Sequence, residues 1–108
     1  MFLAALGQKE QALERYRQMV EIDQNFSEAC NKLGTLLCSL DRRQEACDAY
    51  REALRADPAN VRALYNLADT LDELGLSRPA ADHFRAYLAH DASSEWASHA
   101  QARLKAIQ

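Results

Sequence analysis

The side chains best suited to metal binding or nucleophilic chemistry are three cysteines and three histidines: Cys30, Cys38, Cys47, His83, His90 and His99. Cys30 and Cys38 are about two helical turns apart, which is too far for both thiolates to hold one ion easily. The sequence contains no G-x-S-x-G or H-E-x-x-H motif and no glycine-rich loop that could cradle a phosphate. We therefore predict a protein that is not an enzyme, with no catalytic, cofactor-binding or metal-binding residues, and interpret the cysteines as small semi-buried thiols between helices.

Charge and apolar content restrict the partners. Thirteen Lys and Arg against sixteen Asp and Glu give a net charge of −3. Direct binding to nucleic acid or to a membrane surface needs a basic excess, so neither is expected as a partner. No stretch approaches the roughly 18 apolar residues that span a bilayer. Three cysteines without C-x-x-C spacing fit a reduced chain, so we expect a cytoplasmic protein.

The residues that could carry function must be positioned by helices. The chain has 20 Ala and 15 Leu but only 6 β-branched residues, which favours an all-α fold. Apolar residues recur at helical spacing in six stretches, near residues 9–22, 27–40, 43–56, 61–74, 78–90 and 94–107. Asp41 and Ser94 are expected to cap two of these helices. The short connections predict that consecutive helices are antiparallel neighbours.

The sequence also repeats itself with a period of 34 residues. This shift aligns Ala12 with Ala46 and Ala80, Tyr16 with Tyr50 and Phe84, Arg17 with Arg51 and Arg85, and Asp23 with Asp57 and Asp91. It also places Asp41 midway between the turn glycines Gly7 and Gly75. A helix pair of this length has apolar faces that it cannot bury alone, so neighbouring pairs are expected to stack.

The most complete copy of the repeat carries Leu33-Gly34, Leu37, Ala46, Tyr50, Ala53 and Pro58. This pattern resembles the tetratricopeptide repeat. The resemblance implies an all-α, right-handed superhelical stack of antiparallel helix pairs, formed by residues 1–108 as a single domain. Its parts would be a partial repeat (1–26), two repeats (27–60 and 61–94) and a cap helix (95–108). The second repeat departs from the pattern at Tyr87 and Ala92, where a small residue and a proline are usual.

Two kinds of close contact are expected in such a stack. Gly34 and Ala68 are small because the two helices of a pair approach closely there. Tyr50 and Phe84 are expected to fill the gap between one pair and the next.

The resemblance further implies a concave face, lined by the first helix of each pair, that receives a peptide. The residues expected there are Asn31, Lys32, Thr35, Arg62, Tyr65, Asn66 and Asp69, with Trp96, His99 and Arg103 closing the far end. Asn66 is the strongest candidate, because an amide can pair with both groups of a peptide bond. The cations with which some repeats clamp a ligand's C-terminal carboxylate are not matched. An ordinary solvated polar face remains the alternative interpretation.

These features favour a non-catalytic module that binds a protein or peptide partner. A second resemblance opens an alternative: residues 84–106, with Tyr87, Leu88 and Trp96, are similar to the ends of some bacterial repeat proteins, including modules attached to MerR-type regulators. It implies a C-terminal regulatory module of a larger bacterial transcription regulator or transferase. A self-associating structural unit is the third hypothesis.

The front of the first repeat is incomplete. Counting back by the period places Met1 at the ninth position of a repeat, so most of its leading helix is missing. Leu13, Tyr16 and Val20 would then form an uncovered apolar face. We expect either a homodimer through the N-terminal end or a longer array that supplies the missing helix.

Overall fold

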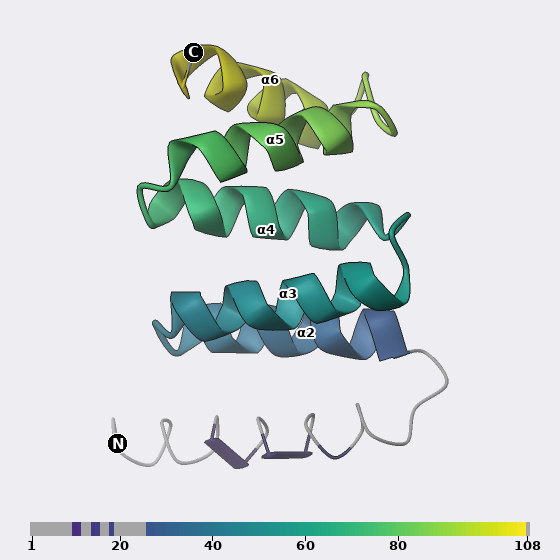
Figure 1. The fold of residues 1–108 in the computed structure, drawn as a ribbon, viewed down its shortest axis with the longest axis vertical. Coiled ribbons are helices and arrows are strands. Elements are labelled where there is room, and N and C mark those ends of the chain that lie inside the picture. Colours follow the sequence, from purple (N-terminus) through teal and green to yellow (C-terminus); the bar gives the residue numbers. More distant parts are fainter. Residues whose placement is uncertain (1–9, 12–13, 16–17, 19–25, 108) are drawn as a thin grey trace. The chain divides into compact units, whose positions relative to one another are not determined.

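The computed structural model describes residues 10–11, 14–15, 18 and 26–107. Within these residues it contains no strand, and five complete helices (Figure 1): α2 (Phe26–Ser39), α3 (Arg43–Ala56), α4 (Val61–Glu73), α5 (Ser77–Leu88) and α6 (Glu95–Ile107). The predicted helices agree with these bounds to within one or two residues. None of the helices in these ranges is long and apolar enough to cross a membrane.

Most of the first predicted helix, residues 9–22, lies outside the described residues. The described positions within it, 10–11, 14–15 and 18, are helical. Leu13, Tyr16 and Val20 are not among them. The predicted N-terminal apolar face and the homodimer that it would form therefore stay predictions.

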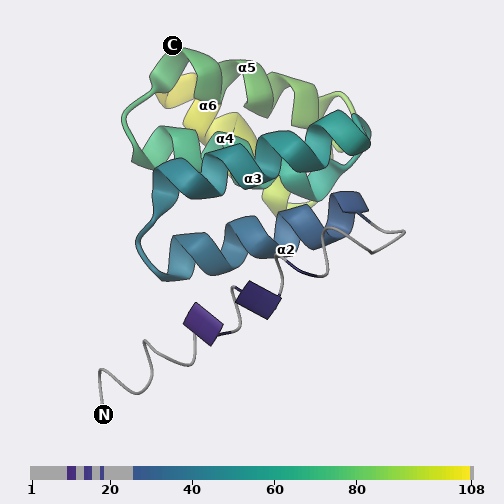
Figure 2. The same ribbon diagram turned by 60° about the horizontal axis from the view of Figure 1, so that its bottom comes forward.

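The chain divides into two compact units, residues 1–60 and residues 61–108, which we call the N-terminal and C-terminal units. In the N-terminal unit, α2 and α3 form an antiparallel pair joined by a short turn (Figure 1). In the C-terminal unit, α5 packs against both α4 and α6 (Figure 2). The division falls where the sequence predicts one repeat to end and the next to begin.

The α2–α3 pair is built around the contact between Gly34 and Tyr50. A Cβ atom placed on Gly34 would lie within 2.7 Å of three atoms of the Tyr50 ring, so only glycine leaves room for it. The Tyr50 hydroxyl lies 3.3 Å from Thr35 Oγ1 on α2, and burial raises its pKa. The sequence-based expectation that Tyr50 fills a gap between successive pairs misses this contact, because the ring covers the glycine of its own pair.

Small side chains also mark the helix contacts of the C-terminal unit. Ala68, Ala80, Ala97 and Ala100 are completely buried, and they come from all three helices. The large buried side chains Phe84, Leu67 and Leu71 fill the space between these helices. This agrees with the prediction that alanine marks positions where the helices approach closely.

Helices α2 and α4 end in the same way. Arg42 N–H donates to Leu37 O and Leu76 N–H donates to Leu71 O, both at 2.9 Å, the hydrogen bond of a Schellman motif. The left-handed residue of the motif is Asp41 (φ 61°) after α2 and Gly75 (φ 79°) after α4.

The two caps predicted from the sequence have different outcomes. The cap predicted at Asp41 is wrong, because Asp41 belongs to the end of α2 and Arg42 is the residue that precedes α3. The cap predicted at Ser94 is confirmed, because Ser94 Oγ accepts the N–H of Ala97 at 3.1 Å.

The Gly34–Tyr50 contact predicts a sign reversal in a double-mutant cycle. Gly34→Ala should destabilise the protein by about 1–3 kcal/mol, because the added methyl group overlaps the ring. In a Tyr50→Leu background the same change should be neutral or stabilising, because alanine has the higher helix propensity. Urea unfolding followed by circular dichroism measures all four proteins. Equal destabilisation in both backgrounds would contradict the contact.

Replacing the left-handed residue should have opposite effects on stability at the ends of α2 and α4, because one end carries Asp41 and the other Gly75. Gly75→Ala should cost roughly 1–2 kcal/mol of stability, because a left-handed φ strains any residue with a Cβ atom. Open space around Gly75 means that no steric clash adds to this cost. Asp41→Gly should raise the urea midpoint slightly, because it removes the same strain. A Gly75→Ala protein with the wild-type urea midpoint would refute the left-handed conformation assigned to Gly75.

Candidate functional site

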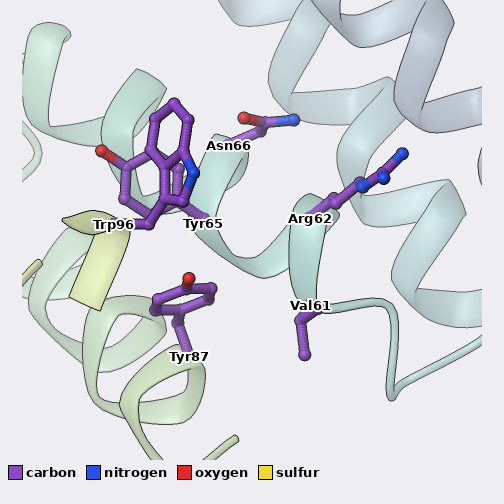
Figure 3. A pocket seen from close by; sticks show the side chains of 6 residues that line it. All are labelled: Val61, Arg62, Tyr65, Asn66, Tyr87 and Trp96. Atoms are coloured by element: carbon purple, nitrogen blue, oxygen red, sulfur yellow. The ribbon is translucent and has the colours of Figure 1, made fainter. Parts of the chain in front are cut away.

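A pocket of about 400 Å³ lies on the C-terminal unit (Figure 3). Its lining comes from all three helices: Val61, Arg62, Tyr65 and Asn66 from α4, Tyr87 from α5 and Trp96 from α6. The four α4 residues form two adjacent pairs one turn apart, Val61–Arg62 and Tyr65–Asn66, so they lie on one side of the helix. In Figure 3 the side chains of Arg62 and Asn66 extend away from the aromatic rings, so the pocket has an aromatic part and a polar edge.

Tyr65 is the centre of an aromatic cluster. Its ring makes edge contacts with Phe84, Tyr87 and Trp96, at centroid distances of 6.1, 5.3 and 5.1 Å. Tyr65 is only 8% exposed, whereas Trp96 is 62% exposed. The cluster thus runs from the core to the surface, where the indole presents a large apolar area to solvent.

The tyrosine hydroxyl groups of the pocket are held by hydrogen bonds. Tyr65 Oη lies 2.5 Å from Nδ1 of His99 on α6. Burial raises the pKa of Tyr65 to about 12, and the charge of Asp69 adds to this effect. Tyr87 Oη donates to Asp91 Oδ2 at 2.5 Å. Both rings are therefore anchored at the hydroxyl end as well as by packing.

Asp91 organises the turn between α5 and α6. Its carboxylate accepts hydrogen bonds from the hydroxyls of Ser94 and Tyr87 and from the backbone N–H groups of Ser93 and Ser94. The bonds from the Ser94 and Tyr87 side chains lower the pKa of Asp91 to about 2. The ionised carboxylate thus connects a ring of the pocket to the start of α6.

Carboxylates occupy the turns of α4 that follow the pocket. The Arg103 guanidinium binds both oxygens of Asp72, at 2.5 and 3.0 Å, and so ties α6 to α4. Burial raises the pKa of Asp69, and the neighbouring charge of Glu73 raises it further. The α4 face therefore changes from the cation Arg62 at its N-terminal end to carboxylates at its C-terminal end.

The C-terminal unit brings together three of the residues proposed from the sequence, Arg62, Tyr65 and Asn66. Asp69 lies one turn beyond Tyr65 on α4 and does not line the pocket. Of the residues expected to close the far end, Trp96 lines the pocket, while His99 and Arg103 bind α4 side chains.

Sequence reasoning did not place Val61 or Tyr87 in the site. Both line the pocket. The available signal was the departure from the repeat pattern at Tyr87, where a small residue is usual. A large aromatic side chain at such a position has to occupy space outside the helix contact.

The other proposed groove residues belong to the N-terminal unit. Lys32 is exposed, while Asn31 is buried, with 4% of its surface exposed. Thr35 Oγ1 lies 3.2 Å from the backbone oxygen of Asn31 and also contacts the Tyr50 hydroxyl. Thr35 therefore supports the helix pair, and the ligand contacts predicted for Asn31, Lys32 and Thr35 stay predictions.

The cysteines also lie in the N-terminal unit. Cys30 and Cys47 are buried, and burial raises the pKa of each thiol. Cys38 is half-buried, with its Sγ 3.8 Å from the Tyr50 hydroxyl. The burial of Cys30 and Cys47 and the partial burial of Cys38 agree with the interpretation of the cysteines as small semi-buried thiols. Among the residues placed by the structure, no three His, Cys, Asp or Glu side chains gather closely enough to hold a metal ion.

Comparison with known proteins identifies one family. The family described as the CABIN1 N-terminal domain matches residues 2–106 of the chain. No curated protein matches the sequence.

Three solved structures share the fold. One is the Yersinia enterocolitica type III secretion chaperone SycD in complex with a peptide of the translocator YopD, at 18% identity and a TM-score of 0.84. Another is PcrH from Pseudomonas aeruginosa, at 21% identity and a TM-score of 0.81. Each comparison covers 96% of this chain and 82% of the other. The third is MamA, at 18% identity and a TM-score of 0.81. That comparison covers 96% of this chain and 59% of MamA.

These similarities concern the fold alone, since the identities are low. They confirm the tetratricopeptide-like helical fold predicted from the sequence. The relatives named above give no support to the likeness of residues 84–106 to MerR-type modules.

The Asp91 network predicts a pH-dependent contribution to stability. Its folded-state pKa of about 2 lies below the ordinary value of 3.8, so the ionised carboxylate stabilises the folded protein above pH 3.8. This contribution is lost as the pH falls from 3.8 towards 2. Asp91→Asn should therefore be less stable than wild type at neutral pH, and the difference should shrink across that window.

Urea melts at a series of pH values measure the difference. Asp82→Asn is the matched control, because it removes one carboxylate from the exposed surface of α5, where Asp82 lies 3.2 Å from Arg85 and outside the pocket lining. Its effect on stability should be small at every pH. A stability difference for Asp91→Asn that stays constant down to pH 2 would contradict the role of the charge.

Proposed function

We propose that this chain, which belongs to the family of the CABIN1 N-terminal domain, is a non-catalytic module that binds a peptide segment of a partner protein. The observation that carries the proposal is the pocket of the C-terminal unit, in which the exposed indole of Trp96 lies beside Arg62 and Asn66. The SycD structure, which has the same fold, contains a bound peptide and supports this proposal.

The pocket offers the two kinds of contact that peptide recognition needs. Trp96, Tyr65 and Tyr87 provide rigid apolar surface, which is typical of the residues that dominate binding energy at protein interfaces. The Asn66 amide provides a donor and an acceptor, which match the two polar groups of a peptide bond. A ligand can thus be held by its backbone at Asn66 and by a side chain at the rings.

The protonation states of the pocket favour binding over catalysis. The pKa values of Tyr65 and Tyr87 are raised, chiefly by burial, so both hydroxyls stay protonated at neutral pH. The Tyr87 hydroxyl already donates to Asp91, and the Tyr65 hydroxyl is paired with His99. Neither tyrosine is arranged as a nucleophile or a general base.

Lys32 and Thr35, on α2 of the N-terminal unit, stay separate proposed peptide contacts. Asp69, beyond the pocket on α4, is a further proposed contact. No feature of the described helices favours the alternative of a regulatory module in a larger transcription regulator or transferase.

The test is a binding screen against a library of random short peptides. Peptides selected by the wild-type protein should bind an Arg62→Ala/Asn66→Ala protein at least about tenfold more weakly, because both polar contacts of the pocket are lost. Circular dichroism should show unchanged helicity, since the side chain of Arg62 is exposed and that of Asn66 is only partly buried.

The matched control is Arg78→Ala/Gln101→Ala, which removes an exposed arginine and an exposed amide from α5 and α6, outside the pocket. It should bind like wild type. Lys32→Ala, made separately, tests the contact proposed on the N-terminal unit and should weaken peptide binding. Equal affinity of the wild-type and Arg62→Ala/Asn66→Ala proteins for every selected peptide would refute the proposed site.

A further inference from the structure

We propose that Asp91 is a positioning residue of the pocket, because its carboxylate holds the Tyr87 ring and the start of α6, which carries Trp96, in one fixed arrangement. Asp91 itself does not line the pocket. This inference rests on the proposed function and adds a residue outside the lining on which peptide binding depends.

Tyr87 is the first of the two rings that Asp91 holds. The Tyr87 hydroxyl donates to Asp91 Oδ2 at 2.5 Å, and the ring packs at an edge against Tyr65 with a centroid distance of 5.3 Å. Tyr87 lies at the C-terminal end of α5 and lines the pocket (Figure 3). A hydrogen bond to a charged acceptor is stronger than one between neutral groups, so rotation of this ring away from the pocket loses a strong contact.

Trp96 is held indirectly, through the backbone at the start of α6. Asp91 Oδ1 accepts the N–H groups of Ser93 and Ser94 at 3.3 and 3.2 Å, and Oδ2 accepts the Ser94 hydroxyl. Ser94 Oγ in turn accepts the N–H of Ala97 at 3.1 Å and so caps α6. Because Trp96 is 62% exposed, packing covers only part of the indole, and its direction depends on the turn that Asp91 closes.

The preceding repeat contains a similar turn without a ring. At the period of 34 residues, Asp57 corresponds to Asp91. Asp57 Oδ1 accepts the N–H of Ala59, two residues further along the chain, at 3.0 Å, and Asp91 Oδ1 accepts the N–H at the corresponding place in its own turn. Ala53 stands at the position of Tyr87 and has no hydroxyl to donate. The link from the turn carboxylate to an aromatic ring therefore arises with the departure from the repeat pattern at Tyr87.

Two roles of Asp91 have to be separated, support of the fold and positioning of the rings. Loss of a supporting contact lowers stability but leaves the affinity of the folded protein for a peptide unchanged. Loss of a positioning contact lowers that affinity, because the peptide then has to order the Tyr87 and Trp96 side chains as it binds. The affinity of the folded protein and the spectrum of its single tryptophan distinguish the two roles.

Three variants divide the contacts of Asp91. Asp91→Asn keeps the size of the side chain but replaces one accepting oxygen by an amide nitrogen, which cannot accept a hydroxyl proton. Tyr87→Phe keeps the ring and removes only the hydroxyl, so the hydrogen bonds of the turn stay intact. Asp57→Asn is the matched control, since it makes the same change at the corresponding turn, where Ala53 stands at the position of the tyrosine.

The probe is acetyl-GSLSG-amide, a peptide with one apolar side chain between peptide groups. Isothermal titration calorimetry on the full chain measures its binding, at a temperature at which far-UV circular dichroism shows every variant to be folded. Asp91→Asn should bind the probe about three- to tenfold more weakly than wild type, the size expected when one or two side chains are ordered on binding. The near-UV circular dichroism of Trp96 should weaken in the same variant, because the turn no longer fixes the indole.

The other variants assign this effect to the two rings. Tyr87→Phe should bind the probe about two- to threefold more weakly, because one ring is released, and should keep the Trp96 signal. The double variant Tyr87→Phe/Asp91→Asn should bind like Asp91→Asn, because both changes remove the same hydrogen bond. Asp57→Asn should match wild type in affinity and in the Trp96 signal.

Four results would overturn the inference. They are a folded Asp91→Asn protein with the wild-type affinity or the wild-type Trp96 signal, a Tyr87→Phe protein with the wild-type affinity, a double variant that binds more weakly than Asp91→Asn, and equal weakening by Asp57→Asn and Asp91→Asn. The Tyr87→Phe result decides even where Asp91→Asn does not fold. In each of these results the probe still binds to wild type, so the proposed function survives. Absence of probe binding by every protein, together with an empty peptide screen, would refute the proposed function itself, and an unchanged Trp96 signal in Asp91→Asn would then overturn the positioning role as well.

Discussion

Helices approach one another in this chain where their side chains are smallest, and the positions of the large side chains depend on that constraint. In the N-terminal unit the absence of a side chain at Gly34 leaves the space that the Tyr50 ring occupies. In the C-terminal unit fully buried alanines occur on α4, α5 and α6. Close approach leaves little volume for bulky residues between the helix axes. The large aromatic side chains of α4 and α6 therefore gather at the edge of the contacts, where Tyr65 meets Trp96.

Tyr65 connects the core to the candidate site. Its ring touches the buried Phe84 on one side and the exposed Trp96 on another, and its hydroxyl is paired with His99. A ligand at the indole would thus meet a surface that packing and hydrogen bonding already hold in place. Because a preorganised surface loses little side-chain entropy on binding, a small pocket of this kind can bind a short peptide. Rigidity of the cluster is therefore part of the proposed function.

The electrostatics of the C-terminal unit separate structural charges from the charge at the pocket. Asp72 binds Arg103 and so joins α4 to α6, whereas Asp91 binds the Tyr87 hydroxyl and holds the turn after α5. Arg62 is the charged residue of the pocket lining. Proteins of similar fold at 18–21% identity carry no information about such details, because function depends on the residues of a site and not on the fold that holds it.

Local spacing in the sequence was sufficient to predict the helices, the small residues at their contacts, and Arg62, Tyr65 and Asn66 on one face of α4, because helical periodicity is a property of neighbouring residues. Local patterns were insufficient at Asp41, which was assigned as the cap of α3, because the end of one helix and the start of the next compete for the same residues. They were insufficient also for Tyr87, which joins Tyr65 from α5. Contacts between side chains on different helices depend on how the helices pack. Only the tertiary structure therefore decided that an aromatic pocket with a single charged side chain forms on the C-terminal unit.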